Sequence, residues 1–220
     1  MKRSRALFFA LAVALLLYGC NVVFDTIQGS GKSTTETRNV SGFTTVELDG
    51  GGDLQLEQTG TESLTITADD NLLQYLTSDI SSGRLKLGTQ SGTHVSSSRP
   101  VLYKLTVKNL NGIVLAGSGT VDGKNLASDS MRIEIAGSGK ITTSGSADRA
   151  ELIVEGSGNY SGDRFKTKNA RVEIDGSGGV SVAASDTLDV TINGSGSVEY
   201  IGDPKVTTTR NGSGSVGKKH

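Results

Sequence analysis

Two glutamates offer the clearest possibility of catalysis in this sequence. Glu134 and Glu151 each stand shortly before a Gly-Ser-Gly motif. In a stack of repeated strands they would lie one strand and two residues apart, at about 8 Å. That separation is typical of the carboxylate pair of an inverting glycosidase. One carboxyl of such a pair must be kept neutral by burial or by a like charge, whereas arginines accompany these glutamates in the repeat.

The same glutamates also belong to a regular pattern of alternating charge. The charged residues five or three positions before successive Gly-Ser-Gly motifs are Arg132, Glu134, Glu151, Arg171, Glu173 and Asp189. Opposite charges on neighbouring strands hold the register of a sheet, and each pair contributes under about 1 kcal/mol. We therefore interpret these residues as an exterior charge ladder and expect no catalytic residue and no enzyme. Polysaccharide cleavage is the weaker alternative.

The sequence gives little support for nucleotide or metal binding. Residues 29–34 resemble the end of a phosphate-binding loop, but Thr26 occupies the place of its first glycine and a polar stretch follows. Such a loop needs a preceding strand and a following helix, so we expect no nucleotide. The aspartates that suggest calcium lie at predicted turns, where aspartate bonds its own backbone: Asp49, Asp53, Asp69 and Asp70. We predict no metal and no cofactor.

The composition excludes further classes of protein. The 220 residues include one cysteine and two histidines, His94 and His220, and carry a net charge of −1. One cysteine excludes a disulfide framework, and so few cysteines and histidines exclude the usual zinc sites. A near-neutral chain with 5% aromatic residues has neither the phosphate-seeking charge nor the stacking platforms of a nucleic-acid-binding protein.

The N-terminus predicts export and a lipid anchor. Basic residues precede an apolar run, Ala6 to Leu17, which is long enough for a secretory signal but short for a membrane span. The run ends in Leu17-Tyr18-Gly19-Cys20, which resembles the bacterial lipobox. The resemblance implies a signal peptide over residues 1–19 and acyl chains on Cys20, enough together for stable anchoring.

The segment after the lipidated cysteine is expected to be a flexible tether over residues 20–38. Asn21 follows the cysteine in place of the aspartate that commonly retains lipoproteins at the inner membrane. The resemblance to lipoproteins therefore favours the outer membrane, on either its surface or its periplasmic face.

A repeat occupies the rest of the chain. Gly-Ser-Gly recurs every 18–20 residues, and apolar residues stand two and four positions before and four positions after most first glycines. Alternation, a glycine turn and another apolar position indicate strand, bend and strand. Such units bury an apolar face only by stacking. We predict an all-β, right-handed parallel β-helix (β-solenoid) with about 18–20 residues per rung.

The two ends of the repeat are less regular. Residues 46–54 follow the same pattern around Gly50-Gly51-Gly52, and alternating strands are predicted around residues 64–66, 85–87 and 105–107. Residues 70–76 are expected to form a helical turn and residues 88–100 a surface loop. Thr208 and Arg210 replace aliphatic residues in the last rung, so residues 205–220 are predicted to be a cap that blunts the sheet edge.

A family resemblance rests on four groups of residues: 39–43, 46–54, 68–73 and the Gly-Ser-Gly rungs. Together they are similar to the GIN-domain family, whose members are described as heads of auto-transporter adhesins. The likeness covers about residues 39–216 and implies a β-helical domain of bacterial envelopes without family catalytic residues. It implies an adhesin-like surface that binds a glycan or a protein. A periplasmic scaffold or envelope-stress partner is the alternative.

Overall fold

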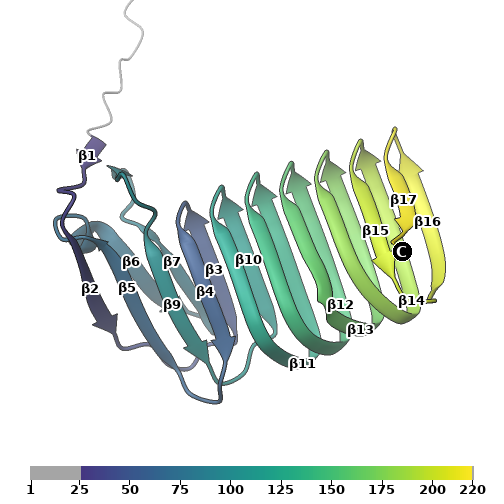
Figure 1. Cartoon of the computed structure of the whole chain (residues 1–220), viewed down its shortest axis with the longest axis horizontal. Helices are drawn as coiled ribbons and strands as arrows, with labels where there is room; N and C mark the ends of the chain where they lie inside the picture. Colours follow the sequence, from purple (N-terminus) through teal and green to yellow (C-terminus); the bar gives the residue numbers. More distant parts are fainter. Residues whose placement is uncertain (1–25, 220) are drawn as a thin grey trace, which may run out of the picture.

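The computed structural model describes residues 26–219, so the predicted signal peptide and Cys20 lie outside the described residues. The chain folds into a β-solenoid of about five turns, preceded by a cap of shorter strands (Figure 1). The only helical element among the described residues is one turn of 3-10 helix, η1 (Leu73–Tyr75). No helix in residues 26–219 has the length and apolarity to span a bilayer.

The solenoid is built from strands that pair in parallel with their counterparts one rung away. Its strands are β3 (Thr45–Gly50), β4 (Asp53–Gln58), β10 (Gly112–Gly117), β11 (Thr120–Gly137), β12 (Lys140–Gly156), β13 (Asn159–Gly176), β14 (Gly179–Gly194), β15 (Ser197–Ile201), β16 (Lys205–Asn211) and β17 (Ser215–Lys218). The first glycines of successive Gly-Ser-Gly motifs are register partners, 18–20 residues apart. The predicted fold and rung length are confirmed.

The core consists of aliphatic columns that run along the solenoid. Residues two and four positions before each first glycine from Gly117 to Gly194 are at most 2% exposed, and Val121, Ile141 and Val180 on the opposite sheet are at most 3% exposed. Burying one such side chain contributes about 1.5–3 kcal/mol. Each column alternates with an outward-facing polar column, as the period of a β-strand requires.

The Gly-Ser-Gly turns and the equivalent Gly50-Gly51-Gly52, which we call the glycine tips, set the distance between rungs. The amides of Ser118 and Gly119 donate to the carbonyl of Gly50 on the rung below, at 3.0 and 3.1 Å, and this contact recurs along the edge formed by the tips. Gly156 shows why the position admits only glycine. Its φ is +108°, and an added Cβ would lie 2.7 Å from the carbonyl oxygen of Gly137.

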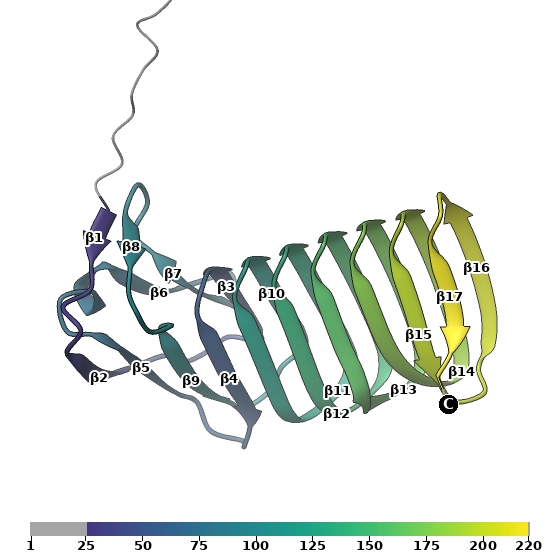
Figure 2. The ribbon, with the colours of Figure 1, turned by 45° about the horizontal axis from the view of Figure 1, so that its top comes forward.

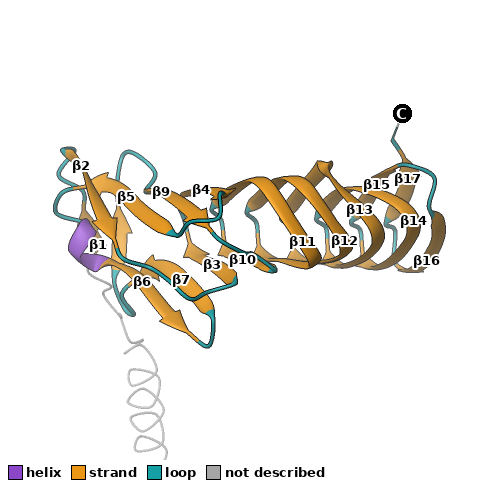
Figure 3. Ribbon diagram, turned by 90° about the horizontal axis from the view of Figure 1, so that it is seen from below, coloured by secondary structure: helices purple, strands orange, loops and turns teal. Residues whose placement is uncertain are grey.

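Most strands of the N-terminal cap come after the first solenoid strands, β3 and β4, in the sequence. Between β4 and β10 the chain leaves the stack to form β5 (Ser63–Asp69), β6 (Leu76–Ser81), β7 (Arg84–Thr89), β8 (His94–Ser96) and β9 (Leu102–Val107). β7 stacks in parallel on β3 and β9 on β4, while β5 and β6 run antiparallel to β9 and β7. The predicted strands and the helical turn are present, and η1 lies at this end of the molecule (Figure 3).

The tether expected over residues 20–38 is wrong for its described part. β1 (Thr26–Gln28) pairs with β8, and β2 (Ser33–Arg38) pairs antiparallel with β5 (Figure 2). The guanidinium of Arg38 donates to the carbonyls of Leu73 and Leu76 at 2.9 and 2.7 Å, which ties β2 to η1. Because β2 starts at Ser33, no helix follows residues 29–34. The predicted loop over residues 88–100 likewise contains β8.

The C-terminal rung has the polar character that was predicted. Thr208 and Arg210 on β16 are exposed, because no further rung covers them, and Val206 and Val216 pack partly against the core. A polar last rung is a poor template for pairing with another chain.

Substituting Gly156 tests the tip contact. We expect Gly156→Ala to lower the free energy of unfolding by about 2 kcal/mol or more, since a left-handed alanine is strained and its Cβ meets the Gly137 carbonyl. Urea unfolding measures the change. Ser157→Ala, at the neighbouring exposed position, is the matched control and should change stability little. Equal stability of the two variants would contradict the tip constraint.

Two buried tyrosines predict alkaline sensitivity. Burial raises the pKa of Tyr103 to about 12 and also raises the pKa of Tyr160, which hydrogen-bonds Thr143. Unfolded tyrosine ionises near pH 10, so above that pH the unfolded chain binds fewer protons than the native one. The free energy of unfolding should therefore fall between pH 10 and 12, by up to about 1.4 kcal/mol per pH unit for each tyrosine.

Unfolding by urea at a series of pH values measures this loss. Tyr103→Phe should reduce the loss of stability between pH 10 and 12 by more than it changes the free energy of unfolding at pH 7. A decline of unchanged slope in Tyr103→Phe would show that another group is responsible.

Candidate functional site

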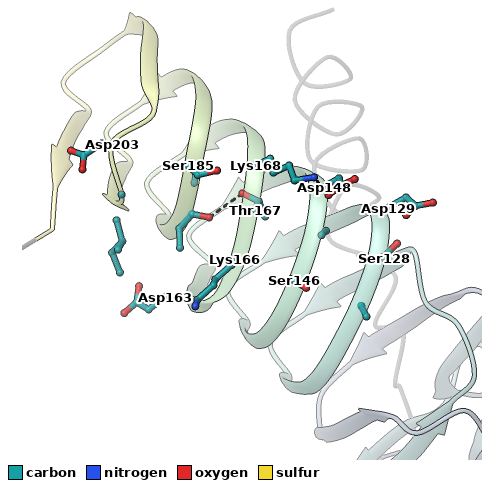
Figure 4. Close-up of a pocket in the computed structure, with 16 residues that line it drawn as sticks. Ser128, Asp129, Ser146, Asp148, Asp163, Lys166, Thr167, Lys168, Ser185 and Asp203 are labelled. Atoms are coloured by element: carbon teal, nitrogen blue, oxygen red, sulfur yellow. Dashed lines mark hydrogen bonds and ion pairs between the residues drawn. The ribbon is translucent and has the colours of Figure 1, made fainter.

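A groove crosses the rungs where the solenoid bends between its two sheets (Figure 4). We name it the cross-rung groove; its volume is about 1030 Å³. Its floor column is Ser128, Ala147, Thr167, Ala184 and Gly202. One rim is Asp129, Asp148, Lys168, Ser185 and Asp203. The other rim is Ala127, Ser146, Lys166, Ala183 and Ile201, with Asp163 beside it.

Small residues and β-bulges produce the hollow. Alanine, serine, glycine and one threonine stand in the floor column, where the core columns carry leucine, valine or isoleucine. The register shifts in this bend between Gly123 and Leu126, between Thr142 and Ser144, and between Gly162 and Lys166. Bulges of this kind bend a strand and re-aim its side chains. The only polar side chain deeply buried in the floor, Thr167, donates to the carbonyl of Ala183 at 2.9 Å.

Ion pairs neutralise most of the charges around the groove. Lys168 contacts Asp148 at 2.8 Å. At the far end, Lys218, the last residue of β17, contacts Asp203 at 2.5 Å, and Lys219, which follows it, contacts Asp163 at 2.6 Å. Hydrogen bonds from Lys168 and Lys219 hold the pKa of Asp148 and Asp163, respectively, below the usual aspartate value.

Two charged residues of the groove have no such partner. Asp129 and Lys166 form no ion pair within 4 Å among residues 26–219. A second hollow of about 430 Å³ shares Ala127, Ser128 and Asp129 with the groove and extends it toward Asn111.

The predicted charge ladder lies on the outer face of the segment that precedes each glycine tip. The register places Arg132, Glu151, Arg171 and Asp189 side by side on successive rungs. Arg132 contacts Glu151 at 2.5 Å and Glu134 at 3.4 Å. Arg171 contacts Glu173 at 4.0 Å. Within residues 26–219, Asp189 forms no ion pair, so the contacts do not run through every rung.

The two candidate catalytic glutamates share one guanidinium. Arg132 touches both Glu134 and Glu151, and the hydrogen bond to Glu151 raises the pKa of Arg132 above its usual value. The side chains of Glu134 and Glu151 are 30% and 45% exposed, so both ion pairs lie at the surface. The contact between Arg132 and Glu151 joins neighbouring rungs, as expected of exposed ion pairs that hold the register of a sheet.

Three of the four aspartates considered for calcium have other side-chain partners. Asp49 pairs with Lys86 at 2.7 Å, Asp69 accepts a hydrogen bond from Ser97 at 2.9 Å, and Asp70 accepts one from Ser30 at 2.6 Å. Within residues 26–219 no three side chains of His, Cys, Asp or Glu are grouped so that they could hold a metal.

The cross-rung groove was not predicted from the sequence. The available signal was a pair of small residues followed by aspartate in the first two bends, Ala127-Ser128-Asp129 and Ser146-Ala147-Asp148. The bulges vary the distance between these segments and the glycine tips, so alignment on the tips alone does not bring them into one column.

Comparison with known proteins agrees with this architecture. A crystal structure of a "putative adhesin" from Bacteroides fragilis matches with a TM-score of 0.71 and 22% identity, over 88% of this chain and 100% of that one. A "putative adhesin" from Parabacteroides distasonis gives 0.56 and 21%, over 89% and 100%. A "putative lipid binding protein", also from Parabacteroides distasonis, gives 0.56 and 27%, over 89% and 100%.

No curated protein matches the chain. A family model does, over residues 42–204, which include β3 to β15 and the whole cross-rung groove. The chain therefore belongs to the family described as "Putative auto-transporter adhesin, head GIN domain".

Proposed function

We propose that this protein is lipid-anchored in the cell envelope and presents its solenoid as a rigid, non-catalytic, adhesin-like binding surface. The observation that carries the proposal is the cross-rung groove, whose lining residues come from five consecutive strands, β11 to β15. Parallel pairing joins these strands on both sides of the bulges and keeps the groove residues of successive rungs in one column. Such a scaffold keeps surface groups at constant spacing, which suits recognition of a repetitive or extended partner.

The anchor fits the placement of the two ends of the chain. Cys20 in its lipobox stands six residues before Thr26, the first described residue. β1 belongs to the N-terminal end of the molecule, and the C-terminus lies at the opposite end (Figure 1). Acyl chains on Cys20 would therefore hold the cap near an outer membrane and direct the groove outward.

Removing the lipid site tests the anchor. We expect Cys20→Ser to move the protein from the membrane fraction to the soluble fraction, because one exported domain without acyl chains has no stable membrane attachment. Fractionation of the native cell and mass spectrometry of the N-terminal peptide measure this. Asn21→Ser is the matched control and should stay in the membrane fraction. Membrane association that survives Cys20→Ser would contradict the proposal.

Protease treatment of intact cells complements this test. Digestion of the protein while a periplasmic control survives would support the surface adhesin. Protection until the outer membrane is opened would instead favour the periplasmic scaffold.

Neutralising the shared glutamates tests the absence of catalysis. We expect Glu134→Gln and Glu151→Gln each to change the free energy of unfolding by less than about 1 kcal/mol, with a smaller change at high salt, since these ion pairs are exposed. Urea unfolding at two salt concentrations measures the effect. Cleavage of a polysaccharide by the parent protein that disappears in both variants would establish an enzyme and overturn the ladder interpretation.

A further inference from the structure

We propose that the cross-rung groove binds an extended, uncharged oligosaccharide laid along the axis of the solenoid. This inference rests on the proposed function and gives the chemical class of its ligand. Aligned bends of five consecutive strands line the groove, which is open to solvent along that axis (Figure 4).

The spacing of the rungs matches a chain of sugars. Four steps of about 4.8 Å separate Ala127 on β11 from Ile201 on β15, a length of about 19 Å. The advance of one ring in an extended β-linked glycan is comparable to one rung. Each sugar would therefore meet an equivalent set of floor and rim positions, as a repeating ligand on a repeating scaffold requires.

The charges of the groove favour an uncharged ligand. Asp148, Asp163 and Asp203 are each engaged by a lysine at 2.5–2.8 Å. The two remaining charges, Asp129 and Lys166, have opposite signs. An anionic polymer would be repelled by Asp129, which has no ion-pair partner, and a cationic polymer would be repelled by Lys166. Neutral hydroxyl groups can instead donate a hydrogen bond to Asp129 and accept one from Lys166.

The lining also suits the two kinds of surface that a sugar carries. Methyl groups of Ala147 and Ala184 in the floor offer apolar contact to ring faces. Ser146, which is exposed, offers a hydroxyl partner to the ring edges. The hydroxyl of Ser128 already donates to the carbonyl of Ser130 at 2.8 Å, so toward a sugar it can only accept. Thr167 is already satisfied through Ala183, so an apolar ring face over the floor leaves no buried donor unpaired.

Other occupants fit less well. A peptide strand across the rungs could not extend the sheet, because the backbone groups of β11 to β14 already pair with neighbouring rungs. Its own amides would lose water against alanine without gaining partners. An acyl chain needs an enclosed apolar pocket, whereas this groove is open and has charges on both rims.

Binding by the full-length, detergent-solubilised protein tests the proposal. The probes are linear β-1,4-linked hexasaccharides of glucose, mannose and N-acetylglucosamine, with hexagalacturonate as the anionic comparison, measured by titration calorimetry. We expect at least one neutral hexasaccharide to bind, with affinity rising about tenfold or more from its trisaccharide to its pentasaccharide. Absence of binding by all three neutral probes, or tighter binding of hexagalacturonate, would overturn the proposal.

Two serines on β12 and its tip provide matched variants. We expect Ser146→Tyr, which fills the groove, to weaken binding about tenfold or more. Ser157→Tyr adds the same ring at an exposed tip away from the groove and should bind like the parent. Equal effects of the two tyrosine variants would overturn the assignment to the groove.

Two further outcomes separate this inference from the proposed function. Binding of phosphatidylglycerol vesicles or of an unstructured peptide that Ser146→Tyr abolishes, without any oligosaccharide binding, would overturn the ligand class. Surface exposure in intact cells would then still support the adhesin-like role. Oligosaccharide binding by a protein that is protected in intact cells would support the ligand and refute the surface location.

Discussion

The hydrogen bond between one glycine tip and the next is the contact on which the rest of the solenoid depends. Amides of each tip donate to the carbonyl of the first glycine one rung below, as Ser138 and Gly139 do to Gly117 at 3.0 and 3.1 Å. A side chain at that glycine would separate the backbones. Because the tips stack directly, the residues in the segment before each tip meet their equivalents on the next rung. The core columns and the charge ladder are consequences of that alignment.

This dependence explains how much of the fold was predictable. Apolar residues two and four positions before a tip glycine, such as Val172 and Ile174, must be buried once the tips stack. A local pattern therefore determines a long-range structure throughout the regular rungs. The N-terminal cap follows no such rule. β3 pairs with β10 across a large insertion, and no local signal tells which strands the insertion adds to the stack.

The misassigned tether and the missed groove have the same physical origin. Residues 33–38 carry no apolar alternation; their strand exists because β5 offers a free edge and η1 offers carbonyls to Arg38. The groove arises where bulges break the fixed count from the tips, as between Gly162 and Lys166. In both places the structure depends on contacts between segments far apart in the sequence, and the 18–20-residue period does not predict it.

The last rung connects the end of the solenoid to the candidate site. The polar last rung, formed by β16 and β17, protects the open sheet edge. Lysines at its end also neutralise aspartates of the groove. Lys218 and Lys219 neutralise Asp203 and Asp163 at the far end of the groove. With β17 displaced, that end would present two carboxylates without partners, and the near-neutral groove would become acidic. The pairing of β17 with β15 therefore also positions the two ion pairs on which the proposed selectivity for uncharged ligands depends.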